Sequence, residues 1–167
     1  KGKLIAYQAL VLSYNKLGNI SKAFQLTLQA IKIAERHNLK QELSNKLFLM
    51  GNIHSLLGNY RKALGYYRQS KIIADSIQDV SWSIMSEGSM GVSYLNLNMI
   101  DSATYYIEST NKTAVVLNID WLTANQLTKL GHLEKKKGNH NKALNCYKLA
   151  LSFDGSSSVK AELLFHM

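Results

Sequence analysis

The sequence predicts an all-α fold, an α-solenoid of stacked antiparallel helix pairs, on the basis of three observations. The 167 residues contain no proline, which suits uninterrupted helices. Nearly the same eleven residues recur at multiples of 40 positions, as LGNISKAFQLT, LGNYRKALGYY and KGNHNKALNCY. Between these segments, apolar residues follow the i, i+3, i+4, i+7 spacing of one helical face. Each predicted helix pair must stack on the next one to bury its apolar stripe.

Four columns of residues keep their type when the copies are aligned. They are an alanine (Ala23, Ala63, Ala103, Ala143), a glycine or asparagine five positions before it (Gly18, Gly58, Asn98, Gly138), a position twelve before it that is mostly glycine (Val11, Gly51, Gly91, Gly131) and a small residue seven after it (Ala30, Ser70, Thr110, Ala150). Asparagine is the common substitute for glycine at positive φ, so the second column predicts a turn. The small residues predict close approach of two backbones.

Each copy is therefore expected to form two helices on either side of the glycine turn. The expected helices span residues 3–17 and 21–37, 41–57 and 61–77, 81–97 and 101–117, and 121–137 and 141–153. Ser21, Asp101 and Asn141 are expected N-caps, and Asn38 and Asn118 are expected to end helices.

The same period divides residues 1–167 into a single array with repeats 1–40, 41–80, 81–120 and 121–158. The segment VKAEL from Val159 follows LKQEL from Leu39 after three periods, so residues 159–167 are expected to open a fifth repeat or to serve as a cap. Because the chain starts at Lys1 rather than at a methionine and stops inside this helix, we expect it to be part of a longer protein.

These columns resemble the tetratricopeptide repeat, with leucine, glycine and tyrosine in the first helix, a glycine turn, and alanine, an aromatic position and alanine in the second. The resemblance covers essentially the whole chain. It departs at Val11, which replaces the glycine, at Thr27 and Ile107, which replace the aromatic residue, and in its period of 40 against the usual 34. The long period resembles Leu-Gly-Asn-type G-protein regulators, kinesin light chains and bacterial peptide-sensing regulators. HEAT-like repeats are the alternative, but they do not predict the glycine turn.

The resemblance implies a right-handed superhelix whose first helices line the concave side. A stripe beside the core stripe of each first helix then faces the groove. This groove is expected to be mixed and apolar through three repeats and basic in the fourth. The candidate partner-binding residues are Gln8, Leu12, Phe48, Asn52, Ser55, Val92, Leu95, Asn96, Lys129, His132, Lys135 and Lys136.

Such a groove is expected to bind an extended or helical peptide with apolar anchors and an acidic end. Phe48 and Leu95 would be the anchors, although packing between adjacent repeats is an equal alternative for both. Leu12 stands where a chaperone-binding groove would need asparagine, so that class of partner is not expected. Among the other candidate residues, Asn52 and Asn96 would form hydrogen bonds with the peptide backbone. Lys129, His132 and Lys136 would recognise acidic groups.

The net charge of +9 comes from 20 lysines and arginines against 11 acidic residues. Part of it lies in the segment KLGHLEKKKGNHNK near the C-terminal end. Such charge attracts nucleic acid, anionic lipid or acidic peptide, or forms a solvated lysine face that aids solubility. A nucleic-acid-binding module is therefore the alternative function, weakened because the aromatic residues are expected at helix interfaces. Self-association through the array ends is a third possibility.

The sequence offers no constellation that predicts an enzyme, a metal site or a cofactor. The five histidines show no metal-ligand spacing with Cys146, which is expected to pack between helices. The segment GSMGVS lacks the spacing of a hydrolase nucleophile elbow, and no phosphate-binding glycine loop is present. No apolar run approaches the roughly 20 residues of a membrane span. We therefore expect a non-catalytic protein-binding or peptide-binding scaffold, the sensing or docking segment of a larger bacterial two-component or transcriptional regulator.

Overall fold

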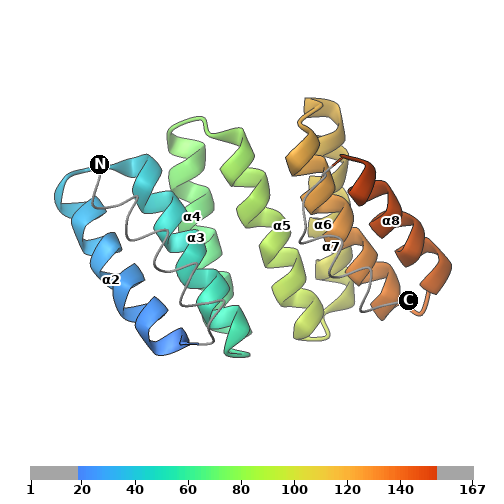
Figure 1. Cartoon of the computed structure of the whole chain (residues 1–167), viewed down its shortest axis with the longest axis horizontal. Helices are drawn as coiled ribbons and strands as arrows, with labels where there is room; N and C mark the ends of the chain where they lie inside the picture. The colour runs from blue at the N-terminus through green and yellow to red at the C-terminus, as the bar shows by residue number, and fades with distance from the viewer. Residues whose placement is uncertain (1–18, 154–167) are drawn as a thin grey trace. The chain divides into compact units, whose positions relative to one another are not determined.

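The computed structural model describes residues 19–153, which lie in helices and the short turns between them. Their helices are α2 (Ile20–Arg36), α3 (Lys40–Leu56), α4 (Tyr60–Ser76), α5 (Val80–Asn96), α6 (Ile100–Leu117), α7 (Asp120–Lys136) and α8 (His140–Phe153) (Figure 1). No strand occurs between residues 19 and 153, and the predicted all-α fold is confirmed. The predicted helix 3–17, the turn at Gly18, the site residues Gln8 and Leu12 and the fifth repeat lie outside the described residues.

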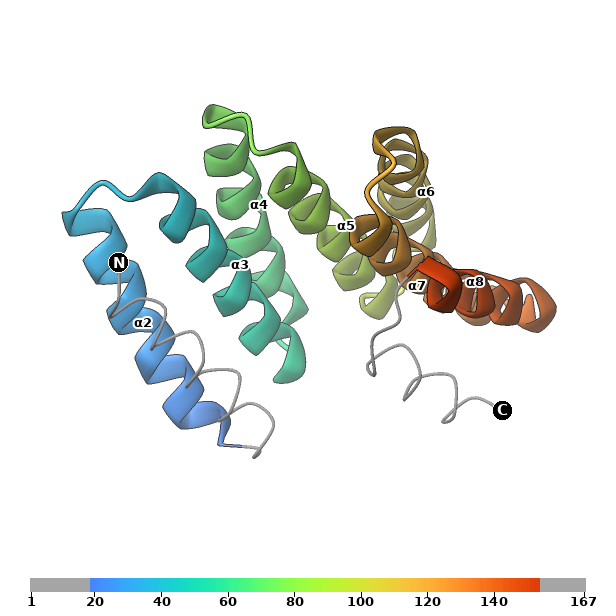
Figure 2. The same cartoon turned by 45° about the horizontal axis from the view of Figure 1, so that its top comes forward.

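Helix packing divides the chain into two compact units, Lys1–Ser86 and Glu87–Met167. In the first unit α3 packs against both α2 and α4, and in the second α7 packs against both α6 and α8 (Figures 1 and 2). The boundary falls inside α5, which gives its N-terminal part to the first unit and its C-terminal part to the second. Continuity of a single array through both units stays a prediction.

The turns between helices share one backbone geometry. Residues with positive φ recur every 20 positions, at Asn38 (50°), Gly58 (73°), Gln78 (57°), Asn98 (60°), Asn118 (51°) and Gly138 (83°). In most of these turns the next residue donates its N–H to the carbonyl five positions before it, as Asn59 does to His54 (2.8 Å), which satisfies a helix-end acceptor. The predicted turns at Gly58, Asn98 and Gly138 and the helix ends at Asn38 and Asn118 are confirmed. The 40-residue period thus consists of two equal halves.

The helix starts differ from the prediction. Ser21, Asp101 and Asn141 lie inside the first turns of their helices rather than at N-caps. The helices α3 to α8 each begin two residues after a positive-φ residue. The N-cap of α2 is Asn19, whose side chain accepts a hydrogen bond from the Lys22 N–H (3.1 Å). The N-cap of α6 is Met99, which provides no side-chain hydrogen bond.

The small-residue columns lie where helices touch, as predicted. The alanine column is buried, with Ala23, Ala63 and Ala103 fully inaccessible. A Cβ at Gly51 would lie 2.5 Å from Cε1 of Tyr67, and one at Gly91 would lie 2.6 Å from Cγ1 of Ile107. Gly131 meets Tyr147 in the same way. In the second, third and fourth repeats, glycine on the first helix therefore receives a large side chain from the second.

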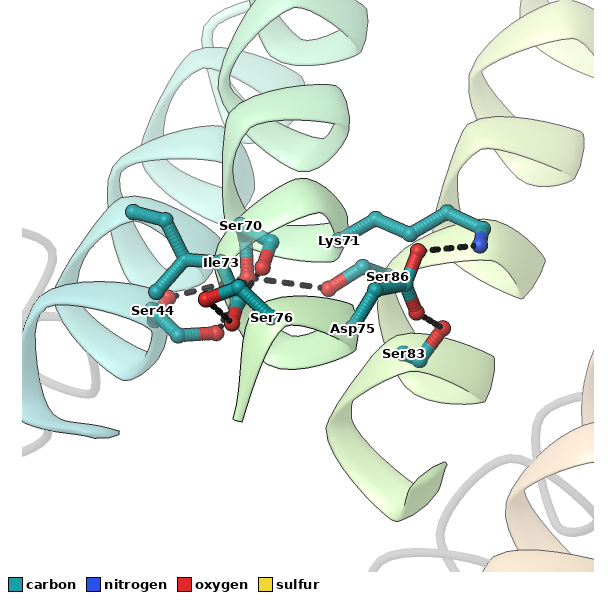
Figure 3. A network of polar contacts seen from close by, with 8 residues as sticks. All are labelled: Ser44, Ser70, Lys71, Ile73, Asp75, Ser76, Ser83 and Ser86. Atoms are coloured by element: carbon teal, nitrogen blue, oxygen red, sulfur yellow. Dashed lines mark hydrogen bonds and ion pairs between the residues drawn. The ribbon is translucent and has the colours of Figure 1, made fainter. Parts of the chain in front are cut away.

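A buried serine network joins α3, α4 and the start of α5 in the first unit (Figure 3). The Ser70 hydroxyl donates to the Ser44 carbonyl (2.9 Å), and the Ser44 hydroxyl donates to the Ser70 carbonyl (3.0 Å). The hydroxyl oxygens of Ser70 and Ser86 are 2.9 Å apart. All three residues are fully buried. Because the hydroxyls bond across helices, these small side chains let three backbones approach without leaving buried polar groups unpaired.

Asp75 adds a polar contact beside this network (Figure 3). Its carboxylate accepts hydrogen bonds from the Ser83 hydroxyl (2.6 Å) and from Lys71 Nζ (2.9 Å). Partial burial acts to raise the pKa of the Asp75 carboxyl, but these hydrogen bonds and the Lys71 charge lower it more, and the net pKa is below its ordinary value. The contact ties the end of α4 to the start of α5.

Candidate functional site

Six of the predicted site residues lie together in the second unit. They line a pocket of about 360 Å³ between the C-terminal ends of α5 and α7, which we call the α5–α7 pocket: Val92, Leu95, Asn96, His132, Lys135 and Lys136. The three α5 residues precede the turn at Asn98, and the three α7 residues precede the turn at Gly138. Corresponding ends of two first helices therefore build the pocket, and the binding of a partner there stays a prediction.

The floor of the α5–α7 pocket is apolar and anchored in the core. Leu95 is 6% exposed and packs with Ala103, Ile107 and Leu133. These contacts correspond to the packing alternative considered for Leu95, while the edge of its side chain still lines the pocket. Beside it, the Asn96 side-chain amide donates to the Val92 carbonyl (2.9 Å), which holds this amide along α5.

The rim of the pocket is positively charged. Lys135 and Lys136 belong to the last turn of α7, where cations also interact favourably with the helix C-terminus. Among the described residues, no carboxylate is part of the pocket lining. Glu134 of the same turn instead accepts a hydrogen bond from the Asn139 side chain (2.9 Å) and lies 3.8 Å from Lys137 Nζ. The pocket therefore attracts an anionic group.

The His132 ring is oriented by α8. It packs edge-on against Tyr147, with ring centroids 5.7 Å apart and an interplanar angle of 87°. Tyr147 is 3% exposed and is held against the backbone of Gly131. His132 is thus presented to the pocket by a ring that the fold fixes in place.

Lys129 does not line the α5–α7 pocket. It is buried on α7, with Nζ 3.5 Å from Oε1 of Gln126 and close to Gly88 of α5, where an added Cβ would lie 3.1 Å from Nζ. Burial lowers the pKa of Lys129 to about 7. This placement separates Lys129 from the other predicted basic residues, and its role in recognising acidic groups stays a prediction.

Three predicted site residues of the first unit surround Tyr67. The Phe48 ring lies 5.4 Å from the Tyr67 ring and 5.2 Å from the Trp82 ring, and Phe48 is 8% exposed. The Tyr67 hydroxyl donates to the Asn52 side-chain oxygen (2.8 Å) and is also hydrogen-bonded to Ser55. Burial raises the pKa of Tyr67. The Tyr67 contacts pack α3 on α4, and the Trp82 ring adds a contact of α3 with the start of α5. This arrangement corresponds to the packing alternative for Phe48, and a role of the three residues in partner binding stays a prediction.

Two further pockets of the structure were not predicted from the sequence. The first, the His54 pocket, measures about 340 Å³ and is lined by Phe24, His54, Lys62, Gly65, Tyr66 and Gln69. The second, the Cys146 pocket, measures about 410 Å³ and is lined by Glu108, Asn111, Lys112, Leu130, Glu134, Lys142, Asn145 and Cys146. Four lining residues of the second stand 80 positions after four of the first. That spacing is the signal that could have identified the pair.

Comparison with known proteins agrees with the repeat analysis. Residues 127–157 match the family model of the tetratricopeptide repeat. The solved structure of BtubC (BKLC) from P. vanneervenii aligns with 19% identity and a TM-score of 0.70, covering 96% of this chain and 64% of that one. A Podosopora anserina putative kinesin light chain with nearly identical repeats aligns with 12% identity and a TM-score of 0.69, covering 98% and 84%. The chain therefore shares its helical-repeat fold with these solved structures.

Other solved structures share this tetratricopeptide-type α-solenoid fold. A Rap protein in complex with competence and sporulation factor aligns with 16% identity and a TM-score of 0.77, covering 90% of this chain and 43% of that one. The apo form of RapI aligns with the same identity and TM-score, covering 99% and 60%. Comparison with curated proteins gave no match.

Two further properties concern residues 19–153. None of the helices in this range is long and apolar enough to cross a bilayer. No group of three or more histidine, cysteine, aspartate or glutamate side chains in the same range is arranged to hold a metal ion.

Proposed function

We propose that the chain is a non-catalytic scaffold that binds an acidic peptide segment of a protein partner in the α5–α7 pocket. One observation carries the proposal: this pocket combines an apolar floor at Val92 and Leu95 with two lysines and a histidine at its rim, and no carboxylate of residues 19–153 lines it. Tetratricopeptide-type repeats generally act as protein-interaction scaffolds, which supports the same conclusion.

A peptide that combines leucine and glutamate side chains fits this chemistry. Its leucine contacts Val92 and Leu95, and its carboxylates accept hydrogen bonds from Lys135 and Lys136. We further propose that the scaffold is the sensing or docking segment of a larger bacterial regulator, two-component or transcriptional. Support comes from the likeness to the Rap protein, whose solved structure contains competence and sporulation factor.

The test measures fluorescence anisotropy of a labelled Leu-Glu-Glu-Leu peptide at about 150 mM salt, where distant charges are screened. The Lys135→Gln, Lys136→Gln double variant is expected to weaken binding about tenfold or more. A double variant of Lys40→Gln and Lys148→Gln removes the same charge from exposed positions outside the pocket and is expected to bind within about twofold of wild type. Equal weakening by both pairs contradicts the proposal, because it assigns binding to bulk charge.

Nucleic acid is the alternative ligand, favoured by the net charge of +9. Two aromatic pairs, Phe48 with Tyr67 and Tyr94 with Tyr106, pack on one another rather than standing free to stack on bases. Binding of a 20-nucleotide single-stranded RNA is expected to vanish at physiological salt. Measurable RNA binding at about 150 mM salt that then decreases steeply as salt is added would favour this alternative.

A further inference from the structure

The His54 imidazole is a feature of the His54 pocket that packing does not explain. Its ring is 8% exposed, lies parallel to Tyr66 (centroids 5.2 Å apart, 9°) and stands edge-on to Phe24 (5.9 Å, 85°). Within residues 19–153, the buried Nδ1 atom of this ring has no hydrogen-bond partner. Leaving a buried polar atom unpaired costs about 1–3 kcal/mol. A reason for the imidazole must therefore outweigh this cost.

The third repeat builds the same ring stack without an imidazole. Tyr94 and Tyr106 stand 40 positions after His54 and Tyr66. Their rings stack with centroids 5.4 Å apart and an interplanar angle of 10°, nearly the geometry of the His54–Tyr66 pair. Tyrosine thus meets the packing requirement at this position. The histidine of the second repeat adds a ring nitrogen that forms no hydrogen bond with the described helices packed around it.

Gly65 is the second feature of this pocket without a packing reason. It lies inside α4, where glycine costs roughly 0.5–1 kcal/mol relative to alanine. A Cβ added to Gly65 would meet no atom within 4 Å, so no neighbouring helix demands glycine. At the equivalent position of the third repeat stands Tyr105, whose ring packs edge-on against Tyr106 (5.3 Å, 83°). The second repeat therefore has no side chain beside Tyr66 where the third repeat has the exposed ring of Tyr105.

The pocket walls define the chemistry of a ligand. Phe24 and Tyr66 provide aromatic surface, which suits a flat ring. Lys62 and Gln69 provide an ammonium group and an amide that can donate hydrogen bonds. We propose that the His54 pocket binds a small aromatic carboxylate, with its ring against Phe24 and Tyr66 and its carboxylate on Lys62 and His54. This site is separate from the α5–α7 pocket and does not depend on the peptide proposal.

The electrostatics of His54 fit this ligand. Burial, and to a smaller extent the charge of Lys62, lowers the pKa of His54, so the free imidazole is neutral at pH 7. α2 presents the uncharged Phe24 to the ring, and α4 presents Tyr66 and Lys62. A bound carboxylate offsets the Lys62 charge and favours the protonated imidazole. Ligand binding is therefore expected to raise the pKa of His54.

The experiment uses 4-fluorobenzoate as the probe and ¹⁹F NMR line broadening as the readout. The uncharged 4-fluorobenzamide has the same ring and nearly the same size, and it is expected to bind about tenfold more weakly. Histidine ¹H–¹³C spectra recorded across pH are expected to show the His54 titration moving to higher pH with the carboxylate and not with the amide. Helix packing alone would not produce this difference.

Two matched variants locate the probe. Gly65→Tyr installs the residue of the third repeat and is expected to reduce 4-fluorobenzoate affinity about tenfold or more, with helix content unchanged because tyrosine is a better helix former than glycine. Lys142→Gln, at the position equivalent to Lys62 in the Cys146 pocket, is expected to leave the affinity unchanged. Equal binding of benzoate and benzamide, wild-type affinity in Gly65→Tyr, or no binding at about 10 mM probe would each overturn the proposal.

Discussion

The second and third repeats place different chemistry on one backbone frame. At equivalent positions both stack two rings between the first helix and the second, His54 on Tyr66 in one and Tyr94 on Tyr106 in the other. The third repeat places two tyrosine rings there, whereas the second places a histidine whose buried Nδ1 atom has no hydrogen-bond partner within residues 19–153. A repeat architecture thus supplies an internal control, because the residue that packing requires can be read from the neighbouring copy.

The largest expected change in stability comes from substituting two glycines of the second repeat, and the two changes have opposite signs. Gly51→Ala places a methyl group against the Tyr67 ring and is expected to lower the free energy of unfolding by about 1–3 kcal/mol. Gly65→Ala enters open space in a helix and is expected to raise it by about 0.5–1 kcal/mol. Urea unfolding followed by circular dichroism measures both. Equal effects of the same sign would show that the two glycines do not differ in packing.

The next change in stability compares the hydroxyls of Ser70 and Thr110, which stand at equivalent positions of the second and third repeats. Ser70→Ala removes bonds to Ser44 and Ser86 and is expected to cost about 1–2 kcal/mol, since buried partners lose a hydrogen bond. Thr110→Val is expected to cost less than about 1 kcal/mol, because that hydroxyl bonds only to Tyr106 and Ile107 of its own helix (2.7 and 3.1 Å). Urea midpoints of the two variants test the ranking, and a larger loss in Thr110→Val would reverse it.

His54→Tyr converts the ring stack of the second repeat to that of the third. Because it removes an unpartnered buried nitrogen, the free energy of unfolding is expected to rise by about 1 kcal/mol, while binding of 4-fluorobenzoate is lost. Thermal unfolding and ¹⁹F NMR on the same sample give both quantities. Destabilisation together with retained probe binding would contradict both halves of this expectation.

The smallest effect depends on pH. The net pKa of Asp75 is lowered in the folded state, so its contribution is present above the unfolded pKa and is lost as the pH falls through the folded pKa. Asp75→Asn is expected to cost a few tenths of a kcal/mol at pH 7 and nothing at acidic pH. In the next repeat Thr123 donates instead to the Ala114 carbonyl (3.2 Å), so Thr123→Val is expected to show no such pH dependence. Unfolding curves at several pH values test the pair.

Much of the fold could be predicted because the pattern occurs in four copies, so that one copy with an unusual residue does not hide it. Four copies of a glycine–alanine pattern locate turns and contacts even where one copy departs, as Asn98 does. The helix starts were misplaced because Asp101 resembles a cap, whereas the turn geometry sets the start at Ile100. Gln78 was missed as a positive-φ residue, since glutamine has no local preference for that conformation and the tertiary frame imposes it.

The candidate site was predictable only in part. Helical spacing brought Val92 and Lys136 to one pocket, because stripes on equivalent helices lie at equivalent positions. Helical spacing does not predict the direction of a long side chain, so it could not show that the Lys129 amine lies close to Gly88. The unpaired nitrogen of His54 depends on its neighbours from two other helices and has no signature in its own segment.

The central claim is that the α5–α7 pocket holds an acidic, leucine-containing peptide. Its most direct test is an amide and methyl NMR titration of the chain with the Leu-Glu-Glu-Leu peptide at about 150 mM salt. The account predicts saturable shifts at Val92, Leu95, His132 and Lys136, with His54 and Tyr66 unchanged. Shifts spread over exposed lysines of both units, or confined to residues outside the α5–α7 pocket, would contradict it.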